Sequence, residues 1–133
     1  MPDRVELNPP WPWASQFRIA QGVQVGNTVY VSGQVAFDPQ GNLVGGDDMG
    51  AQARQVFVNV QSVLAEAGAT MEDVVKITAF LTDMSRYAEY AAARTETFPN
   101  NIPASATVAT PTLVNSDLLV EVEAIAEIGC GGT

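Results

Sequence analysis

The stretch Leu118-Leu119-Val120-Glu121-Val122-Glu123-Ala124-Ile125-Ala126 decides the fold we expect for this chain. Successive side chains of a β-strand point to opposite faces of a sheet. The even-numbered positions from 120 to 126 are all valine or alanine and would form one apolar face. Glu121 and Glu123 would lie on the other face, beside Ile125. The pattern predicts a central strand over residues 118–128 that carries two carboxylates on one side.

A second β-rich run, residues 104–110, precedes this strand and is joined to it by a short polar link. In that run Ser105 and Thr107 alternate with alanine and valine. If the two strands lie near each other, these hydroxyls and Glu121 would converge on one pocket. This convergence is our first hypothesis about a functional site.

Length, composition and charge indicate a globular protein and argue against a nucleic-acid-binding one. A chain of 133 residues, 47% hydrophobic and 16% charged, is expected to form one globular domain with its own core. Six basic residues against fifteen acidic residues give a net charge of −9. Because phosphate backbones repel such a chain and its cations are scattered, we expect no nucleic-acid partner.

Two residue types that carry much catalytic chemistry are rare or missing. The chain has no histidine, which argues against Ser-His and Cys-His nucleophiles and most zinc sites, so we expect neither a metal nor a cofactor. A single cysteine, Cys130, fits a reducing compartment. With no signal-peptide pattern and no segment apolar enough to span a bilayer, a cytoplasmic protein without a membrane partner is the simplest expectation.

Residues 1–16 are rich in proline, so we expect an extended arm with a short edge strand around Val5. Trp11 and Trp13 in this arm either pack against the domain or cap a pocket. Packing is the more common role of aromatic side chains.

A hairpin is expected after the arm, because two β-rich runs flank Gly26-Asn27, a dipeptide that suits a tight turn. The second run ends in Ser32-Gly33-Gln34. Glycine at that point permits a β-bulge or the close approach of a ligand. Leu43-Val44 could add a short strand before the first helix.

The first helix is expected over about residues 50–67, after an N-cap at Asp47 or Asp48 and before Gly68. Its apolar residues recur at helical spacing and would form one stripe that lies on the sheet. Four polar residues are expected to lie largely off that stripe: Gln52, Gln55, Asn59 and Glu66.

A β-branched run predicts a strand at residues 74–81, and a second helix follows. This helix is expected to start at a cap supplied by Asp83 or Ser85 and to run to about Thr97. Arg94 lies on one side of it with several apolar residues. Its side chain either extends to the surface or reaches into a cleft.

The order of these elements predicts an α+β domain with both helices on one face of a mixed sheet. We expect an arm at residues 1–16, one domain at residues 17–128 and a flexible tail at residues 129–133. The second sheet face would need cover, and further copies of the chain, for example in a trimeric barrel, could provide it.

Several of these segments together resemble the RidA/YjgF superfamily over residues 17–128. The resemblance rests on these motifs: Val31-Ser32-Gly33-Gln34, Ala51-Gln52-Ala53-Arg54-Gln55, Pro103-Ala104 and Val120-Glu121-Val122-Glu123-Ala124-Ile125-Ala126. It implies a chorismate-mutase-like subunit in a homotrimer with a central β-barrel and with ligand pockets in the clefts between subunits. Well-known members hydrolyse enamines and imines, such as 2-aminoacrylate and its imine, to a keto acid and ammonia. Other members deaminate related molecules, including 2-aminomuconate.

Four family positions differ in this chain. The arginine that holds the substrate carboxylate aligns with Ser105, which cannot form a bidentate cationic contact. A tyrosine aligns with Ile19, an asparagine on the second helix with Ala91, and a cysteine with Thr107. The substitution at Ser105 indicates a substrate other than the 2-aminoacrylate type and a preference for a neutral or weakly charged ligand, unless Arg18 or Arg94 restores an anion site. Ile19, Ala91 and Phe17 would make the pocket more apolar.

The family match that remains is Ser32 with Gly33, together with Glu121, which matches the glutamate that positions the hydrolytic water. We therefore expect a hydrolase of an imine, an enamine or a related small metabolite, with Glu121 as the catalytic residue. Ser105, Thr107 and Ser32 would be its hydrogen-bond partners. The substrate-binding residues expected are Ser32, Gly33, Ser105, Thr107, Ile19, Ala91 and Phe17.

Other readings stay open. Glu121 and Glu123 could be structural groups at a subunit contact, and the protein could be a noncatalytic trimer that binds a small molecule. A ribonuclease activity, reported for some relatives, is opposed by the acidic charge and the absence of histidine.

Overall fold

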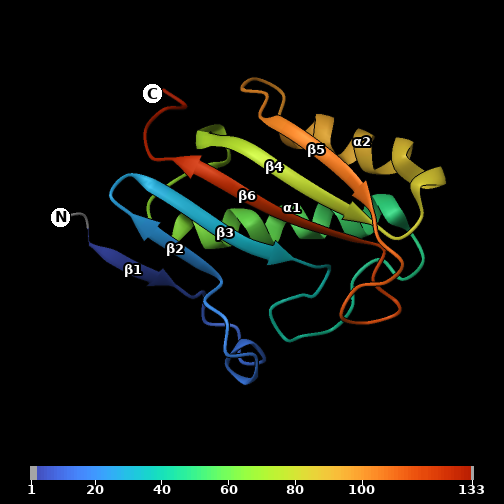
Figure 1. Cartoon of the computed structure of the whole chain (residues 1–133). Helices are drawn as coiled ribbons and strands as arrows, with labels where there is room; N and C mark the ends of the chain where they lie inside the picture. The colour runs from blue at the N-terminus through green and yellow to red at the C-terminus, as the bar shows by residue number, and fades with distance from the viewer. Residues whose placement is uncertain (1–2, 133) are drawn as a thin grey trace.

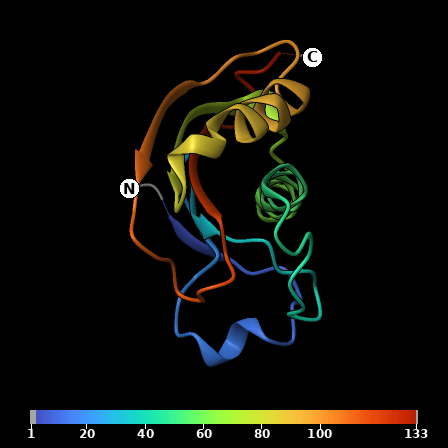
Figure 2. The ribbon, with the colours of Figure 1, turned by 90° about the vertical axis from the view of Figure 1, so that its right-hand side faces the viewer.

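A computed structural model describes residues 3–132, which form a six-stranded mixed sheet with two α-helices on one face (Figures 1 and 2). The α+β architecture predicted from the order of elements is confirmed. The strands and α-helices are β1 (Arg4–Leu7), β2 (Gly22–Val25), β3 (Thr28–Gln34), α1 (Met49–Ala65), β4 (Val74–Leu81), α2 (Tyr87–Thr97), β5 (Ala104–Ala109) and β6 (Val120–Glu127).

The sheet has the strand order β1-β2-β3-β6-β4-β5, so β6 lies at its centre. Neighbouring strands are antiparallel except β4 and β5, which are parallel. Along β6 the even-numbered side chains are buried beneath the helices, and the odd-numbered ones face the other way. The alternation read from the sequence therefore placed this strand correctly.

Helix α1 begins where the sequence predicted. The side chain of Asp48 accepts a hydrogen bond from the backbone N–H of Ala51 at 3.0 Å, which satisfies one of the free donors of the first turn. The apolar stripe of α1 packs on β3 and β6 and forms the middle of the core. Its fully buried members include Ala53, Val56, Val60, Val63 and Leu64.

Two polar residues of α1 correct the expectation that they lie off the buried stripe. Gln52 is fully buried and Asn59 nearly so. The Gln52 side chain donates to the carbonyls of Gly46 and Asp117 and accepts from the N–H of Leu119. Asn59 donates to the carbonyls of Val35 and Phe37. These amides are buried because each satisfies the backbone of an adjoining loop.

The predicted hairpin is confirmed, and so is the bulge after it. Strand β3 advances from Val31 to Gln34 while β6 advances only from Ala124 to Val122, so β3 carries one extra residue here. The short strand expected at Leu43-Val44 is reduced to a single bridge between Phe37 and Leu43.

The two ends of the chain lie against the domain. The edge strand expected around Val5 is present as β1, and Trp11 is buried beyond it. In the C-terminal tail, the N–H of Gly131 donates to the buried carboxylate of Asp73 at 2.9 Å. The flexibility of this tail stays a prediction.

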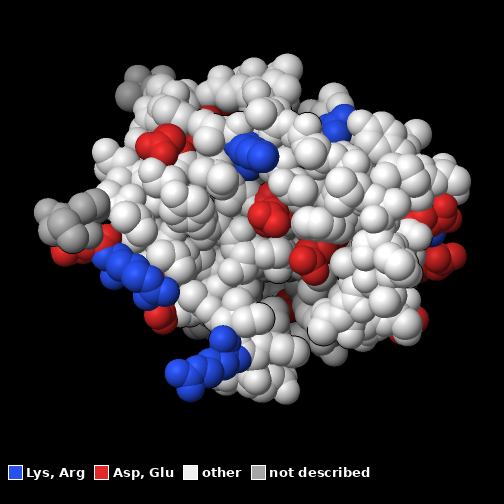
Figure 3. Space-filling view, in the orientation of Figure 1, with Lys and Arg blue, Asp and Glu red and all other residues white. Residues whose placement is uncertain are grey.

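The sheet face opposite the helices is uncovered in the described chain (Figure 2). It exposes Tyr30, 49% accessible, and Val108, 42% accessible, together with the carboxylates of β6. Figure 3 shows this face largely uncharged, with scattered acidic and basic side chains and no continuous basic patch. None of the helices in residues 3–132 has the length and apolarity needed to cross a lipid bilayer.

Candidate functional site

The first candidate pocket, here called the Glu121 pocket, is a cavity of about 270 Å³ beside the bulge of β3. Segments from the N-terminal arm, β3, the loop before β6 and β6 itself meet in it. Its lining consists of Trp13, Phe17, Ile19, Gln21, Ser32, Gly33, Gln34, Val35, Phe37, Val114 and Glu121. Five residues predicted from the sequence come together here: Phe17, Ile19, Ser32, Gly33 and Glu121.

Glycine at position 33 allows Glu121 to lie where it does. A Cβ atom added to Gly33 would collide with the Glu121 carboxylate and would lie 2.8 Å from its Cδ. The β3 bulge therefore brings bare backbone against a carboxyl group, which fits the role predicted for this glycine.

The Glu121 carboxyl group is half-buried. Burial raises its pKa above the ordinary value, and the negative charge of Glu123 two residues on raises it further. Within residues 3–132, neither oxygen of this carboxylate accepts a hydrogen bond or forms an ion pair. A carboxyl group of this kind can exchange a proton closer to neutral pH than an exposed glutamate can.

Ser32 helps to build the pocket wall and does not bond to Glu121. Its hydroxyl donates to the carbonyl of Ala20 at 2.6 Å, and its N–H donates to the carbonyl of Gln21 at 2.9 Å. Behind it the buried Gln34 side chain donates to the Gln21 side chain at 2.9 Å. Gln21 and Gln34 also line the pocket but were not predicted from the sequence, although Gln34 belongs to the Ser-Gly-Gln motif.

An aromatic cluster closes one side of the Glu121 pocket. Trp13 stacks on Trp11 with ring centroids 5.5 Å apart and meets Phe17 and Phe37 edge-on at 6.0 and 5.7 Å. The Trp13 Nε1–H donates to the carbonyl of Asp38 at 3.1 Å. The two tryptophans therefore differ in role: Trp11 packs in the core, and Trp13 lines the pocket.

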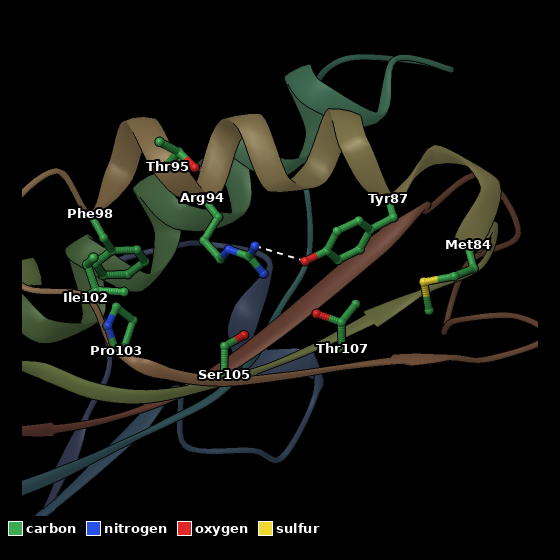
Figure 4. Close-up of a pocket in the computed structure, with 9 residues that line it drawn as sticks. All are labelled: Met84, Tyr87, Arg94, Thr95, Phe98, Ile102, Pro103, Ser105 and Thr107. Carbon is green, nitrogen blue, oxygen red and sulfur yellow. Dashed lines mark hydrogen bonds between the residues drawn. The ribbon is translucent and has the colours of Figure 1, made fainter.

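The second candidate pocket, here called the α2–β5 pocket, is a cavity of about 640 Å³ between α2 and β5 (Figure 4). It is lined by Met84, Tyr87, Arg94, Thr95, Phe98, Ile102, Pro103, Ser105 and Thr107. The two hydroxyls predicted from the sequence, Ser105 and Thr107, rise from β5 toward the helix. Ala91 is partly buried on α2 but is not among the residues that line this pocket.

The predicted convergence of Ser105, Thr107 and Glu121 does not occur within one chain. Strand β4 lies between β5 and β6. Ser105 pairs with Ile77, which is buried under the helices, whereas Glu121 pairs with Phe80 on the uncovered face. Because paired residues share a sheet face, the hydroxyls and the carboxylate lie on opposite faces.

Comparison with known proteins identifies the family. A sequence profile of the family described as Endoribonuclease L-PSP matches residues 14–128. The chain belongs to this family, part of the RidA/YjgF superfamily.

Relatives of this RidA/YjgF family member come from archaea, yeast and bacteria. A RutC family protein of Pyrococcus abyssi is 39% identical over 108 residues, which cover 80% of this chain and 84% of that protein. The mitochondrial protein Mmf1 of Saccharomyces cerevisiae is 36% identical over 107 residues, or 80% of this chain and 73% of that protein. The crystal structure of RidA from an Antarctic Psychrobacter species matches with a TM-score of 0.85 and 36% identity over 93% of this chain and 99% of the other.

The chemical groups of this RidA/YjgF family member that could act on a ligand lie in two separate pockets. The Glu121 pocket offers a half-buried carboxyl group with a raised pKa and an apolar wall. The α2–β5 pocket offers hydroxyls and the guanidinium of Arg94. Among the residues that the structure describes, no three His, Cys, Asp or Glu side chains are grouped as they would be to hold a metal ion.

Proposed function

We propose that this chain is a RidA-like hydrolase that converts an imine, an enamine or a related small metabolite into a carbonyl compound and ammonia. The observation that carries the proposal is Glu121, a half-buried carboxyl group with a raised pKa that faces a pocket beside the bare backbone of Gly33. We further propose that the protein works as a homotrimer without a cofactor or metal.

Glu121 would act as a base, then as an acid, and then as a base again. Its carboxylate takes a proton from a water molecule as the oxygen attacks the carbon of the protonated imine, and the C=N π electrons move to nitrogen, which gives a neutral carbinolamine. The carboxyl group then gives this proton to the nitrogen and takes the hydroxyl proton as the C–N bond breaks, so that the protonated imine and water become a carbonyl compound, ammonia and a proton that Glu121 releases to solvent. A raised pKa suits a group that must alternate between the two forms.

The complete site would lie in a cleft between two copies of the chain. The Glu121 pocket and the α2–β5 pocket occupy opposite sheet faces, so a ligand can meet both only if they belong to different copies. Exposed apolar side chains lie at the rims of both, including Ile19 (60% accessible), Ile102 (84%) and Val114 (74%). Such residues favour burial against a partner.

A noncatalytic trimer that binds a small molecule is the second candidate. It is favoured by the contact between Glu121 and Gly33, since that contact would also explain a purely structural glutamate. We do not propose ribonuclease activity from the family's description, because a net charge of −9 opposes RNA binding and the chain has no histidine. The single cysteine suits the cytoplasm as the place of action.

Ammonia release tests the proposal. Imines would be generated in the assay from a panel of amino acids by an amino-acid oxidase, with catalase present to remove hydrogen peroxide and with no added amine that would itself release ammonia from the imine. We expect the wild-type protein to accelerate ammonia release from at least one imine and Glu121→Gln to remove the acceleration. Ligand binding without acceleration for any imine would instead favour the noncatalytic trimer.

A further inference from the structure

Arg94 places a positive charge in the α2–β5 pocket and is one of the two arginines that the sequence left open as the source of an anion site. Figure 4 shows its guanidinium reaching from α2 into the space above Ser105. Within the described residues the ion pairs involve Arg4, Arg54 and Arg86 as the cations. Arg94 is paired with no carboxylate among residues 3–132, although acidic residues far outnumber basic ones in the chain.

The guanidinium is held in place by two aromatic rings. It donates from Nη2 to the hydroxyl of Tyr87 at 2.9 Å, and its Cζ lies 5.5 Å from the Tyr87 ring centroid and 5.4 Å from that of Tyr90. The hydrogen bond with Tyr87 raises the pKa of Arg94, which keeps the group charged. A guanidinium carries five N–H donors, so most of its donors remain free for a ligand.

Hydroxyl groups lie near this cation. Tyr90 is fully buried and does not line the pocket, and its hydroxyl lies beside Arg94 and Ser105 on the core side. The groups that a ligand in the pocket can reach are therefore the guanidinium and the hydroxyls of the lining residues. Ser105 and Thr107 add hydroxyls from β5.

The rest of the pocket is apolar. Phe98, Ile102 and Pro103 lie at one end and Met84 at the other (Figure 4). The cavity of about 640 Å³ is much larger than a three-carbon acid requires. The short side chain of Ser105 leaves this volume open on the β5 side.

We infer that Arg94 anchors the carboxylate of a substrate that also carries a bulky apolar side chain. This inference rests on the proposed function and names its substrate class, an imino acid with a branched or aromatic side chain. It replaces the expected preference for a neutral ligand and agrees with a substrate other than the 2-aminoacrylate type. Arg94 thus determines specificity from α2, on the opposite wall of the pocket from Ser105.

Binding of phenylacetate, with phenylacetamide as the neutral isostere, tests this role by calorimetry at low salt. We expect the wild-type protein to prefer phenylacetate and Arg94→Met to weaken phenylacetate binding by about 10- to 100-fold, the usual loss for a charge-assisted contact. Phenylacetamide binding should change little. Arg94→Lys keeps the charge without the planar fork and should lose less affinity than Arg94→Met.

Arg54→Met is the matched control, because it removes one arginine whose partner is the exposed Glu96 on the protein surface. It should leave phenylacetate binding unchanged. Thermal melts show whether each variant is folded. If Arg94→Met is not folded, Arg94→Lys is compared with the wild type instead.

Equal phenylacetate affinity in the wild type and in Arg94→Met would overturn the inference. If, in addition, the trimer of Arg94→Met dissociates more easily than that of the wild type, Arg94 pairs with a carboxylate of a neighbouring copy. The binding assay needs no turnover. A protein that selects phenylacetate through Arg94 but releases no ammonia from any imine would therefore overturn the proposed reaction and leave the anion site standing.

A double variant gives a positive test. Arg94→Ser should lose the preference for phenylacetate, and adding Ser105→Arg should restore it by supplying the cation from β5. Ser105→Arg alone places two guanidiniums in one pocket and should gain little. Failure of the double variant to recover any preference, while it remains folded, would contradict an anion site at this place.

Discussion

Glu121 combines two properties that rarely occur together in a structural residue. Its carboxyl group is half-buried, and it accepts no hydrogen bond within residues 3–132. A buried carboxylate kept for stability is usually satisfied by donors, as Asp73 is in this same chain. The contrast between these two acids is the strongest argument for a chemical role of Glu121.

The pH dependence of imine hydrolysis should report Glu121. We expect kcat/KM to fall on the acid side with an apparent pKa above the ordinary glutamate value of roughly 4.3, because burial and Glu123 both favour the protonated form. Glu121→Gln should lower kcat/KM by roughly 10²- to 10⁴-fold and remove this fall of kcat/KM at acid pH, the acid limb of the profile. Glu123→Gln should keep activity but move the limb to lower pH, since it removes a neighbouring negative charge. If the acid limb lies at the same pH in both variants as in the wild type, a group other than Glu121 is responsible for it.

Gly33 should be indispensable to the position of Glu121. In Gly33→Ala, the new methyl group would occupy the space of the Glu121 carboxylate, so we expect kcat/KM to fall at least about tenfold and stability to fall by about 1–3 kcal/mol, a usual cost of overpacking. Gly50→Ala is the matched control, since a Cβ there makes only ordinary contacts near the start of α1. Full activity in Gly33→Ala would show that the observed contact is not needed for catalysis.

At the start of β4, Asp73 ties three segments together. Its carboxylate accepts from the N–H of Thr70 at 3.0 Å and from that of Gly131 at 2.9 Å. Burial alone would raise the pKa of Asp73, but the backbone hydrogen bonds outweigh it and the pKa is lowered. A lowered pKa contributes stability that is present above the pKa of the unfolded chain and is lost as the pH falls through the folded value.

Asp73→Asn should therefore unfold more easily at neutral pH, by about 1–3 kcal/mol, because one of the two N–H donors loses its acceptor. Urea unfolding at pH 7 and pH 3 measures the effect. The difference between wild type and variant should shrink at pH 3, below the unfolded pKa of roughly 3.9. The exposed Asp117→Asn is the control. A difference that is equally large at both pH values would contradict the role of the ionised carboxylate.

The helices and strands could be predicted because their signals are local. The alternation of Val and Glu along β6, the Gly26-Asn27 turn and the Asp48 cap each determine structure over a few residues. The burial of Gln52 could not be predicted. It depends on the carbonyls of Gly46 and Asp117, and a helical pattern carries no information about which loop will need an amide there.

The sequence pointed to most of the predicted residues that line the two candidate pockets, but not to how these residues are arranged. Alternation along β5 and β6 identified Ser105, Thr107 and Glu121 but could not reveal the order of strands in the sheet. Because β4 inserts between them, the same alternation sends the hydroxyls and the carboxylate to opposite faces. The sequence left open whether the Arg94 side chain reaches the surface or a cleft. Its direction depends on contacts with the rings of Tyr87 and Tyr90, which the helical pattern does not reveal.

The proposed assembly is supported by the face that the two helices leave uncovered. Tyr30, Val108 and the rim of the Glu121 pocket would be hidden if the uncovered sheet faces of several copies packed together. A closed ring would also bring each Glu121 pocket toward an α2–β5 pocket of the next copy. In the assembly that we propose, two chains build each active site.

Subunit mixing tests that claim most directly. Glu121→Gln disables the Glu121 pocket, and Thr107→Trp fills the α2–β5 pocket, so each variant should be inactive in ammonia release when refolded alone. When equal amounts are unfolded and refolded together, random assembly leaves one intact cleft in about three-quarters of the trimers, and roughly a quarter of the wild-type activity should return. No recovery in trimers that demonstrably contain both variants would contradict a site shared between chains.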